Sequence, residues 1–168
     1  WDDDIDLFMM RDDYMKFIEI TRTQTQNYKT LSLYTDEKYF YPFAKVVDVR
    51  TKLVEECIKP IDSLGVCVDI FPLDFVDNRK RNSFLLKIQK AIWSGAVRKK
   101  FKDIKSNKLK LYTKIIIFSL FKNKNPRKYA LKIDKIASEI SKRNDIVADI
   151  SMSIKRTFHK SWFSNQIK

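Results

Sequence analysis

The chain has 168 residues, of which 44% are hydrophobic and 13% aromatic, and this composition excludes an intrinsically disordered protein. The formal net charge is +13 at pH 7, but residues 1–78 carry 9 basic and 16 acidic side chains, whereas residues 79–168 carry 25 basic and 5 acidic ones. With 2 glycines that stand apart, 2 cysteines and 1 histidine, the sequence has no glycine-rich phosphate loop, no disulfide framework and no residue set for structural zinc.

The first predicted element is an acidic strand from Asp4 to Met10. Four aspartates lie within five positions at this end of the chain, and in a strand Asp2, Asp4 and Asp6 share one face. Like charges about 7 Å apart along a strand repel each other and are best tolerated beside a cation. Because Mg²⁺ prefers carboxylate oxygens, the run predicts a magnesium site. The alternative is a solvated acidic chain end.

A helix and two short strands are predicted next. Asp12 or Asp13 can cap a helix that ends near Thr23, since apolar residues recur there at helical spacing. After a polar loop, strands are expected at 31–34 and 43–53, where polar and apolar residues alternate.

The clearest strand is predicted at 66–71, between Gly65 and Pro72. Asp69 lies inside this apolar strand, and a carboxylate there is unfavourable unless it is paired or bound to a metal. Asp69 is therefore the strongest functional candidate outside the acidic N-terminal run. Asp48 is its competitor, but basic neighbours make a plain ion pair the simpler explanation at that position.

The second half of the chain is predicted to be mainly helical. Apolar residues recur at helical spacing over 83–101 and 109–121, and Pro126 begins a third helix. A short strand is expected at 146–152. The fold class is therefore α+β.

Two parts of opposite charge are expected within this fold. Residues 1–78 form an acidic core, and residues 79–168 form a basic, mainly helical region that packs on it. A metal on one wall and cationic side chains on the other would suit a protein that handles phosphate. The alternative is that the lysines only cover solvated helix faces.

A cytoplasmic location is expected. The longest apolar run, Ile115 to Phe121, is far shorter than the ~20 residues that span a bilayer. The N-terminus is acidic, unlike a signal peptide, and the cysteines favour a reducing compartment.

Four segments in succession resemble the signatures of the LicD family of phosphocholine and related phosphotransferases. They are residues 1–7 (WDDDIDL), 11–14 (RDDY), 41–48 (YPFAKVVD) and 65–74 (GVCVDIFPLD). The resemblance is strong over residues 1–77 and loose in the basic region. It implies a nucleotidyltransferase-type fold, as in the fukutin-related proteins, with a small mixed sheet flanked by helices.

The resemblance also implies a catalytic metal site. In this fold an acidic pair on one strand and a third acid on a neighbouring strand bind Mg²⁺ or Mn²⁺, and these correspond here to Asp4, Asp6 and Asp69. Further candidates, as substrate contacts, are Asp2, Arg11, Lys45 and Arg50. For the three basic residues, an ion pair with a neighbouring aspartate is the alternative.

The implied reaction moves a phosphocholine-type or other substituted phosphate group from a CDP-linked donor, such as CDP-choline. The implied acceptor is a sugar hydroxyl of a cell-surface glycan, such as a lipopolysaccharide or teichoic acid precursor. The metal would offset negative charge on the phosphoryl oxygens, and Asp69 would accept the proton of the attacking hydroxyl.

The sequence departs from the family pattern at both ends. The family has a Gly-x-Leu-Leu-Gly-x-x-Arg element just before the tryptophan and a Tyr-Gly-Asp segment near its C-terminus, and neither is present here. We therefore expect an internal fragment, and inactivity of that fragment by itself is one open outcome.

Two non-enzymatic alternatives remain for the basic half. It could bind nucleic acid through aromatic residues that lie among the lysines: Trp93, Phe101, Tyr112 and Tyr129. Their helical spacing is typical of a core instead, so no stable nucleic-acid partner is expected. The other alternative is an inactive remnant whose basic helices dock on the inner face of a membrane.

Overall fold

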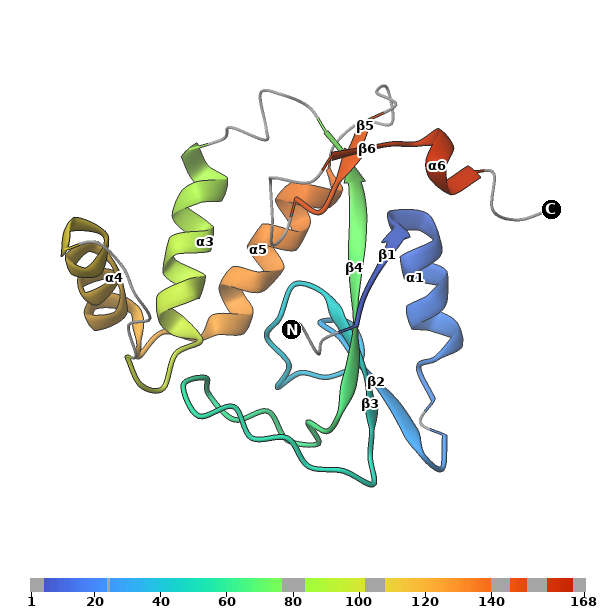
Figure 1. Cartoon of the computed structure of the whole chain (residues 1–168), viewed down its shortest axis with the longest axis horizontal. Helices are drawn as coiled ribbons and strands as arrows, with labels where there is room; N and C mark the ends of the chain where they lie inside the picture. The colour runs from blue at the N-terminus through green and yellow to red at the C-terminus, as the bar shows by residue number, and fades with distance from the viewer. Residues whose placement is uncertain are drawn as a thin grey trace.

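The fold is α+β, with one six-stranded sheet and helices packed against it (Figure 1). The structure is a computed structural model, and it describes residues 5–23, 25–76, 84–101, 108–139, 146–150 and 157–164. Asp2 and Asp4 of the predicted metal run lie outside these residues.

The longest strand, β4 (Cys67–Phe75), organises the sheet. Strand β1 (Asp6–Met10) pairs with it in parallel, and β3 (Ala44–Asp48) pairs with it antiparallel. The remaining strands extend this arrangement: β2 (Tyr28–Leu31) pairs with β3, β5 (Ile146–Ala148) pairs with β4, and β6 (Thr157–His159) pairs with β5. The sheet is therefore mixed, and it combines strands from the acidic and the basic half.

Strand β4 continues through Pro72, so the prediction that this proline ends the strand is wrong. The N–H of Asp69 donates to Ile5 and thus points toward β1. Since N–H groups alternate along a strand, the nitrogen of Pro72 points to the opposite edge. There β3 pairs only as far as Ile70, and β5 begins at Asp74. The missing N–H therefore falls between two partners and removes no ladder hydrogen bond.

The other strands in the first half have different limits from those predicted. Strand β2 begins at Tyr28 rather than at residue 31, because the Thr25 hydroxyl and backbone exchange hydrogen bonds with Tyr28 and start the strand early. Strand β3 ends at Asp48, where the Thr51 N–H donates to the Asp48 carbonyl and closes a turn.

The predicted helices are present with small shifts. They are α1 (Arg11–Ile20), α3 (Phe84–Ala96), α4 (Lys108–Phe121) and α5 (Pro126–Ser138), and a short α6 (Ser161–Ser164) follows β6. Helix α5 begins as expected for Pro126, with the Asn125 side chain accepting from Arg127 N–H. The predicted aspartate cap of α1 is wrong, because the helix begins at Arg11 and has no side-chain cap.

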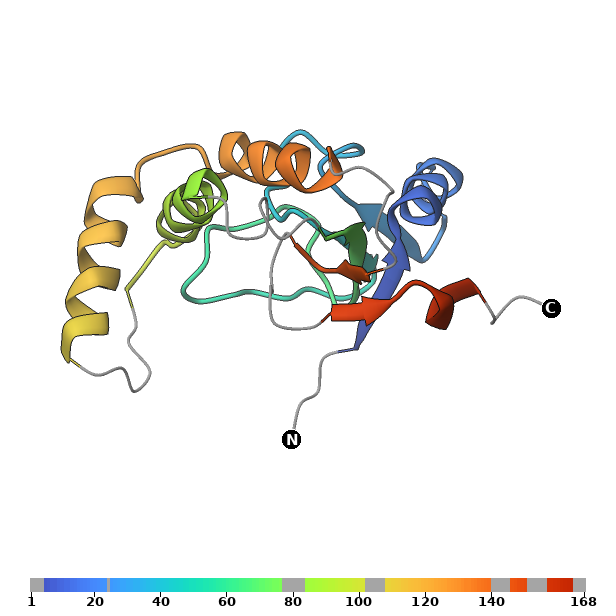
Figure 2. The same ribbon diagram turned by 90° about the horizontal axis from the view of Figure 1, so that it is seen from above.

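Helices cover the sheet on both faces. Helix α1 buries Tyr14 and Ile18 against Ala44 and Ile70. Helices α3 and α5 lie on the other side of β4 and share the larger core with Leu73 (Figure 1, Figure 2). Over the residues that the structure describes, none of the helices combines the length and apolar character needed to cross a membrane.

A buried ion-pair network joins three of these elements. Arg11, at the start of α1, donates to both carboxylate oxygens of Asp74 in β4, at 2.8 and 2.6 Å. It also donates to Asp134 of α5 at 2.8 Å, and the other oxygen of Asp134 accepts from the Tyr34 hydroxyl. Both aspartates are buried, so removing the guanidinium would leave two carboxylates without their cation.

Replacing Arg11 with methionine should therefore destabilise the chain by about 3 kcal/mol, as expected when one partner of a buried ion pair is lost. The measurement is urea unfolding followed by circular dichroism. The matched control is Arg50→Met, which removes a guanidinium from an exposed pair with Asp48 and should leave the midpoint nearly unchanged. Equal losses in the two variants would contradict a structural role for the buried network.

A second, partly buried charge lies where α3 meets the residues that follow β5. The ammonium of Lys90 donates to the carbonyl of Ile150, and burial lowers the pKa of Lys90 from 10.5 to about 8, although nearby Asp149 acts in the opposite direction. At a pH between about 8 and 10.5, the Lys90 side chain is protonated in the unfolded chain and deprotonated in the folded chain. Lys90 therefore makes the free energy of unfolding increase as the pH rises.

The unsubstituted chain should consequently gain stability relative to Lys90→Met as the pH is raised from about 7 to about 10, because the methionine variant lacks this titration. Urea unfolding of both chains at several pH values measures the difference. A difference that stays constant over this range would show that Lys90 is not perturbed by burial.

Candidate functional site

Three charged side chains form a row across β1, β4 and β3. Asp69 of β4 has Asp6 as its register partner on one side and Lys45 on the other. Register partners in a sheet point to the same face and lie about 4.8 Å apart from strand to strand. The fold thus brings together Asp6, Asp69 and Lys45, which the sequence analysis had singled out separately.

Lys45 binds Asp69 directly. Its Nζ lies 2.6 Å from Oδ1 and 2.8 Å from Oδ2 of Asp69, and both side chains are largely buried. Two further contacts hold the ammonium in place, since it lies 5.3 Å from the ring centroid of Tyr41 and 5.2 Å from that of Phe43. The Lys45 ammonium thus fixes the position of the Asp69 carboxylate.

Cys67 belongs to the same cluster. It lies two residues before Asp69 on β4 and so on the same face, with Sγ 3.7 Å from both the Asp69 Oδ1 and the Lys45 Nζ. Burial raises the pKa of the Cys67 thiol, and the Lys45 ammonium only partly opposes this. The thiol therefore acts as a neutral, polarisable neighbour of the ion pair.

Aromatic rings close the site on its apolar side. Phe8 and Phe71 follow Asp6 and Asp69 two residues along their strands, and their ring centroids are 5.6 Å apart. The rings of Phe43 and Phe71 are tilted against each other, with their centroids 4.5 Å apart. This apolar layer excludes water from one side of the row and strengthens the electrostatic interactions there.

Tyr39 adds a polar group without a partner. Its side chain is completely buried, and its hydroxyl has no hydrogen-bond partner in the described structure. Burial raises the pKa of Tyr39, and the negative charge of Asp69 adds to that shift. An unsatisfied buried hydroxyl near a carboxylate is unusual in a purely structural region. Sequence analysis missed Tyr39 because a tyrosine in an aromatic loop carries no distinguishing pattern.

The donor set of the row suits a hard cation. Asp6 and Asp69 offer carboxylate oxygens from adjacent strands, and the Lys45 ammonium shows that a positive charge is stabilised at Asp69. Among the residues placed by the structure, no three acidic, thiol or imidazole side chains form a complete metal cage. Mg²⁺ sites at phosphorylated substrates typically use one or two protein carboxylates, and Asp6 and Asp69 match that number.

Asp48, the competing candidate for the third acid, lies on the other face of the sheet. It is three residues from Lys45 on β3, and side chains alternate between faces. Its carboxylate accepts from Arg50 Nε at 2.9 Å and from the Arg50 terminal nitrogen at 2.6 Å, and these hydrogen bonds lower the pKa of Asp48 to about 2. Asp48 and Arg50 thus form an exposed pair apart from Asp69.

Arg11 also lies apart from the row. Its guanidinium is bound by Asp74 and Asp134, as described above, and burial opposes any approach of a large substrate. Of the three basic residues predicted as phosphate contacts, only Lys45 is placed beside Asp69.

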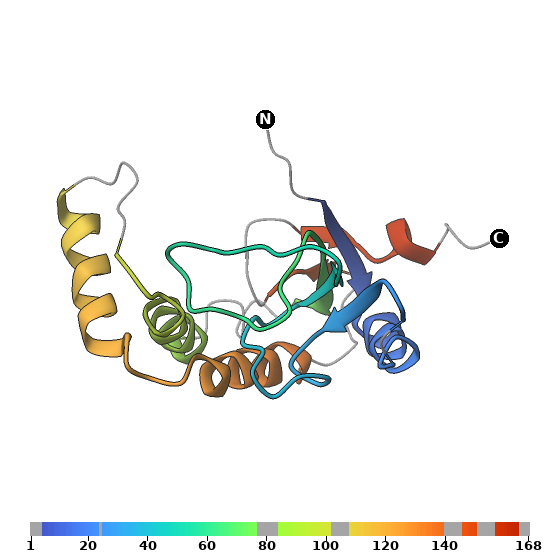
Figure 3. The same ribbon diagram turned by 90° about the horizontal axis from the view of Figure 1, so that it is seen from below.

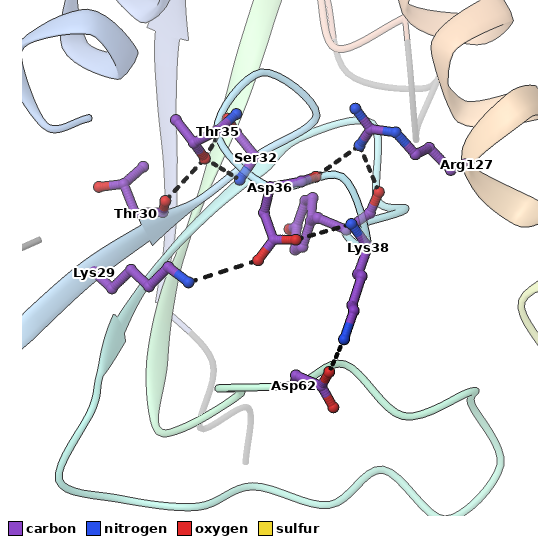
Figure 4. Close-up of polar contacts among 9 residues, drawn as sticks. Lys29, Thr30, Ser32, Thr35, Asp36, Lys38, Asp62 and Arg127 are labelled. Carbon is purple, nitrogen blue, oxygen red and sulfur yellow. Dashed lines mark hydrogen bonds and ion pairs between the residues drawn. The ribbon is translucent and has the colours of Figure 1, made fainter. Parts of the chain in front are cut away.

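The loop between β2 and β3 is fixed by an arginine that sequence analysis did not single out (Figure 4). Arg127 of α5 donates to the backbone carbonyls of Leu33, Asp36 and Tyr39, at 2.7, 2.7 and 3.0 Å. No sequence signal marks this residue, because its acceptors are main-chain atoms. By holding the loop, Arg127 positions Tyr39 and the aromatic residues that follow it.

Further polar contacts within this loop support the same geometry (Figure 4). The Thr35 hydroxyl lies 3.0 Å from the Ser32 hydroxyl and 3.0 Å from the Thr30 carbonyl. The Asp36 carboxylate accepts from the Lys38 N–H at 2.8 Å, and the Lys38 side chain reaches Asp62 at 2.8 Å. The Lys38–Asp62 contact links residues 32–43, the aromatic loop between β2 and β3, to the long connection between β3 and β4.

That connection frames a hollow of about 800 Å³. Residues 51–64 supply most of its lining, and Lys99 and Lys100 complete it. One of its lining residues, Glu55, accepts a hydrogen bond from the Tyr41 hydroxyl at 2.9 Å, and the Tyr41 ring contacts Lys45. The hollow is therefore one aromatic side chain away from the charged row.

One comparison with known proteins found a related protein. The chain is 31% identical over 87 residues to the lipopolysaccharide cholinephosphotransferase LicD of Haemophilus influenzae. The match covers 48% of this chain and 30% of LicD, so it spans less than a third of the relative's length. No protein-family model matches the chain, and neither does any solved structure. The chain is thus similar to LicD over about half of its own length.

Proposed function

We propose that this chain carries the catalytic carboxylates of a LicD-like phosphotransferase. It would move a phosphocholine-type group, or another substituted phosphate, from a CDP-linked donor to a sugar hydroxyl of a cell-surface glycan. The observation that supports this most directly is the row of Asp6, Asp69 and Lys45, because two carboxylates and a cation on one face suit phosphoryl chemistry. The similarity to LicD agrees with it.

Asp6 and Asp69 are the residues that would hold Mg²⁺ or Mn²⁺, with Asp4 as the third ligand in this proposal. A bound divalent cation supplies charge stabilisation for the phosphoryl oxygens of the donor. Lys45 neutralises Asp69 and lies where it can also donate to an anionic group at the row. The aromatic layer of Phe8, Phe43 and Phe71 keeps water away from one side.

Asp69 is also the group proposed to accept the proton of the attacking sugar hydroxyl. The hydroxyl oxygen forms a new bond to the phosphorus that bears the transferred group, and the bond from that phosphorus to the bridging oxygen breaks. The nucleoside monophosphate leaves with the electron pair of that bond. The hollow beside Tyr41 is proposed to take part of the substrate, because the Tyr41 hydroxyl donates to Glu55 in its lining and the Tyr41 ring contacts Lys45.

The acceptor is proposed to be a precursor of lipopolysaccharide or teichoic acid, and the place of action the inner face of the cytoplasmic membrane. The nucleic-acid alternative is weaker, because it depended on exposed aromatic residues in the basic half. Trp93 is buried, Phe101 packs next to Phe118, and Tyr129 packs against the core. Of the four aromatic residues considered, only Tyr112 is exposed.

Metal binding tests the carboxylate site without requiring turnover. Asp6→Asn and Asp69→Asn should each weaken Mn²⁺ binding by at least about tenfold, since each removes a charged ligand. Lys45→Met should strengthen binding, because its ammonium no longer competes for both oxygens of Asp69. Isothermal titration calorimetry measures all three.

The matched control for this titration is Asp48→Asn, which makes the same change on the opposite face of the sheet and should leave the affinity unchanged. Loss of binding in Asp48→Asn with full binding in Asp69→Asn would move the ligand role to Asp48. Unaltered binding in all aspartate variants would remove the metal site from the proposal.

Transfer itself is tested with CDP-choline and a glycan that offers a free sugar hydroxyl, in the longest natural polypeptide that contains this sequence. Asp69→Asn should reduce the release of CMP by at least about a thousandfold, because the variant lacks both a ligand and the proton acceptor. Asp48→Asn should retain activity. Release of CMP that needs the acceptor but survives Asp69→Asn would show that the reacting groups lie elsewhere.

A further inference from the structure

Helix α4 presents an apolar stripe to solvent. Four large side chains recur at spacings of three and four residues and therefore lie on one side of the helix: Leu109, Tyr112, Ile116 and Leu120. Their exposed fractions are 78%, 63%, 57% and 63%, and no residue of α4 is buried. A helix of 14 residues is about 21 Å long, so the stripe runs along nearly its full length.

The opposite side of α4 is the one that attaches it to the protein. Ile117, Phe118 and Phe121 are half-buried there, and the Phe118 ring lies 5.9 Å from that of Phe101. Gly95 of α3 allows this contact, because a Cβ at that position would lie 2.7 Å from the Ile117 carbonyl oxygen. The exposed stripe is therefore not the side on which α4 packs.

The position of α4 leaves this stripe accessible. In all three views α4 lies at the edge of the molecule, beyond α3 and away from the sheet (Figure 1, Figure 2 and Figure 3). Helix α4 packs closely against α3. The stripe thus faces outward from the body of the protein.

The sequence around the stripe is strongly basic. Residues 104–133 contain nine lysines and arginines and no aspartate or glutamate. A second copy of this chain would bring the same positive charge to the contact, and the two copies would repel each other. A surface that offers both negative charge and an apolar interior is complementary to a basic helix with an apolar stripe.

We propose that α4 docks the protein on an anionic lipid bilayer, with Leu109, Tyr112, Ile116 and Leu120 inserted among the lipid headgroups and the positive charge of the basic segment attracted to the anionic surface. The helix lies in the plane of the membrane and does not cross it. This docking stands on α4 alone and is independent of the carboxylate row. It makes the protein peripheral to the membrane.

The test is co-sedimentation with vesicles of phosphatidylcholine containing about one third phosphatidylglycerol. The chain should bind these vesicles, and Ile116→Asp should weaken binding by at least about tenfold, because it removes an apolar contact and adds a repelled charge. The matched control is Ile20→Asp, the same replacement at an exposed position at the end of α1. The logarithm of its fold-loss in vesicle binding should be less than half of that for Ile116→Asp. Circular dichroism verifies that both variants are folded.

Hydrogen exchange of the unsubstituted chain gives a second readout that needs no variant. Anionic vesicles should slow exchange in the segment of α4, whereas pure phosphatidylcholine vesicles should slow it far less. No binding to anionic vesicles, or equal losses in Ile116→Asp and Ile20→Asp, would overturn the proposal. So would light scattering that shows a dimer in the unsubstituted chain and a monomer in Ile116→Asp, because the stripe would then be covered by a second copy.

Discussion

The buried guanidinium of Arg11 is the interaction on which the arrangement of the layers depends. It lies where β1 ends and α1 begins, and it binds one carboxylate on β4 and another on α5. Helix α1 and helix α5 cover different sides of β4, so a single cation ties both layers to the central strand (Figure 1). An unpaired charge is very unfavourable in a buried environment, so this network fixes the position of β1. The same network therefore fixes the register that places Asp6 beside Asp69.

The charged row and the aromatic loop depend on each other. Asp69 is held by Lys45, Lys45 lies against the rings of Tyr41 and Phe43, and Arg127 fixes the loop that leads into those rings. A helix from the basic half therefore helps to hold the charged row of the acidic half in place. The two halves differ in charge, yet the site draws on both of them.

The sequence predicted the α+β class and most helix positions, since these follow from local periodicity. It did not predict that β4 continues through Pro72, because that depends on where its neighbours β3 and β5 end. The sequence also did not predict the roles of Arg127 and Tyr39. Arg127 binds main-chain carbonyls, and Tyr39 is distinguished by the burial of its hydroxyl. Neither property can be read from the order of residues.

The order in which the contacts of the row can form has a consequence for folding. The Lys45–Asp69 contact joins residues 24 positions apart, whereas the Arg11 contacts that accompany the parallel β1–β4 pairing join residues 63 and 123 positions apart. Closing longer loops costs more chain entropy, so the antiparallel β3–β4 pair has the advantage of forming early and β1 joins late. Asp6 thus reaches Asp69 only when distant parts of the chain have met.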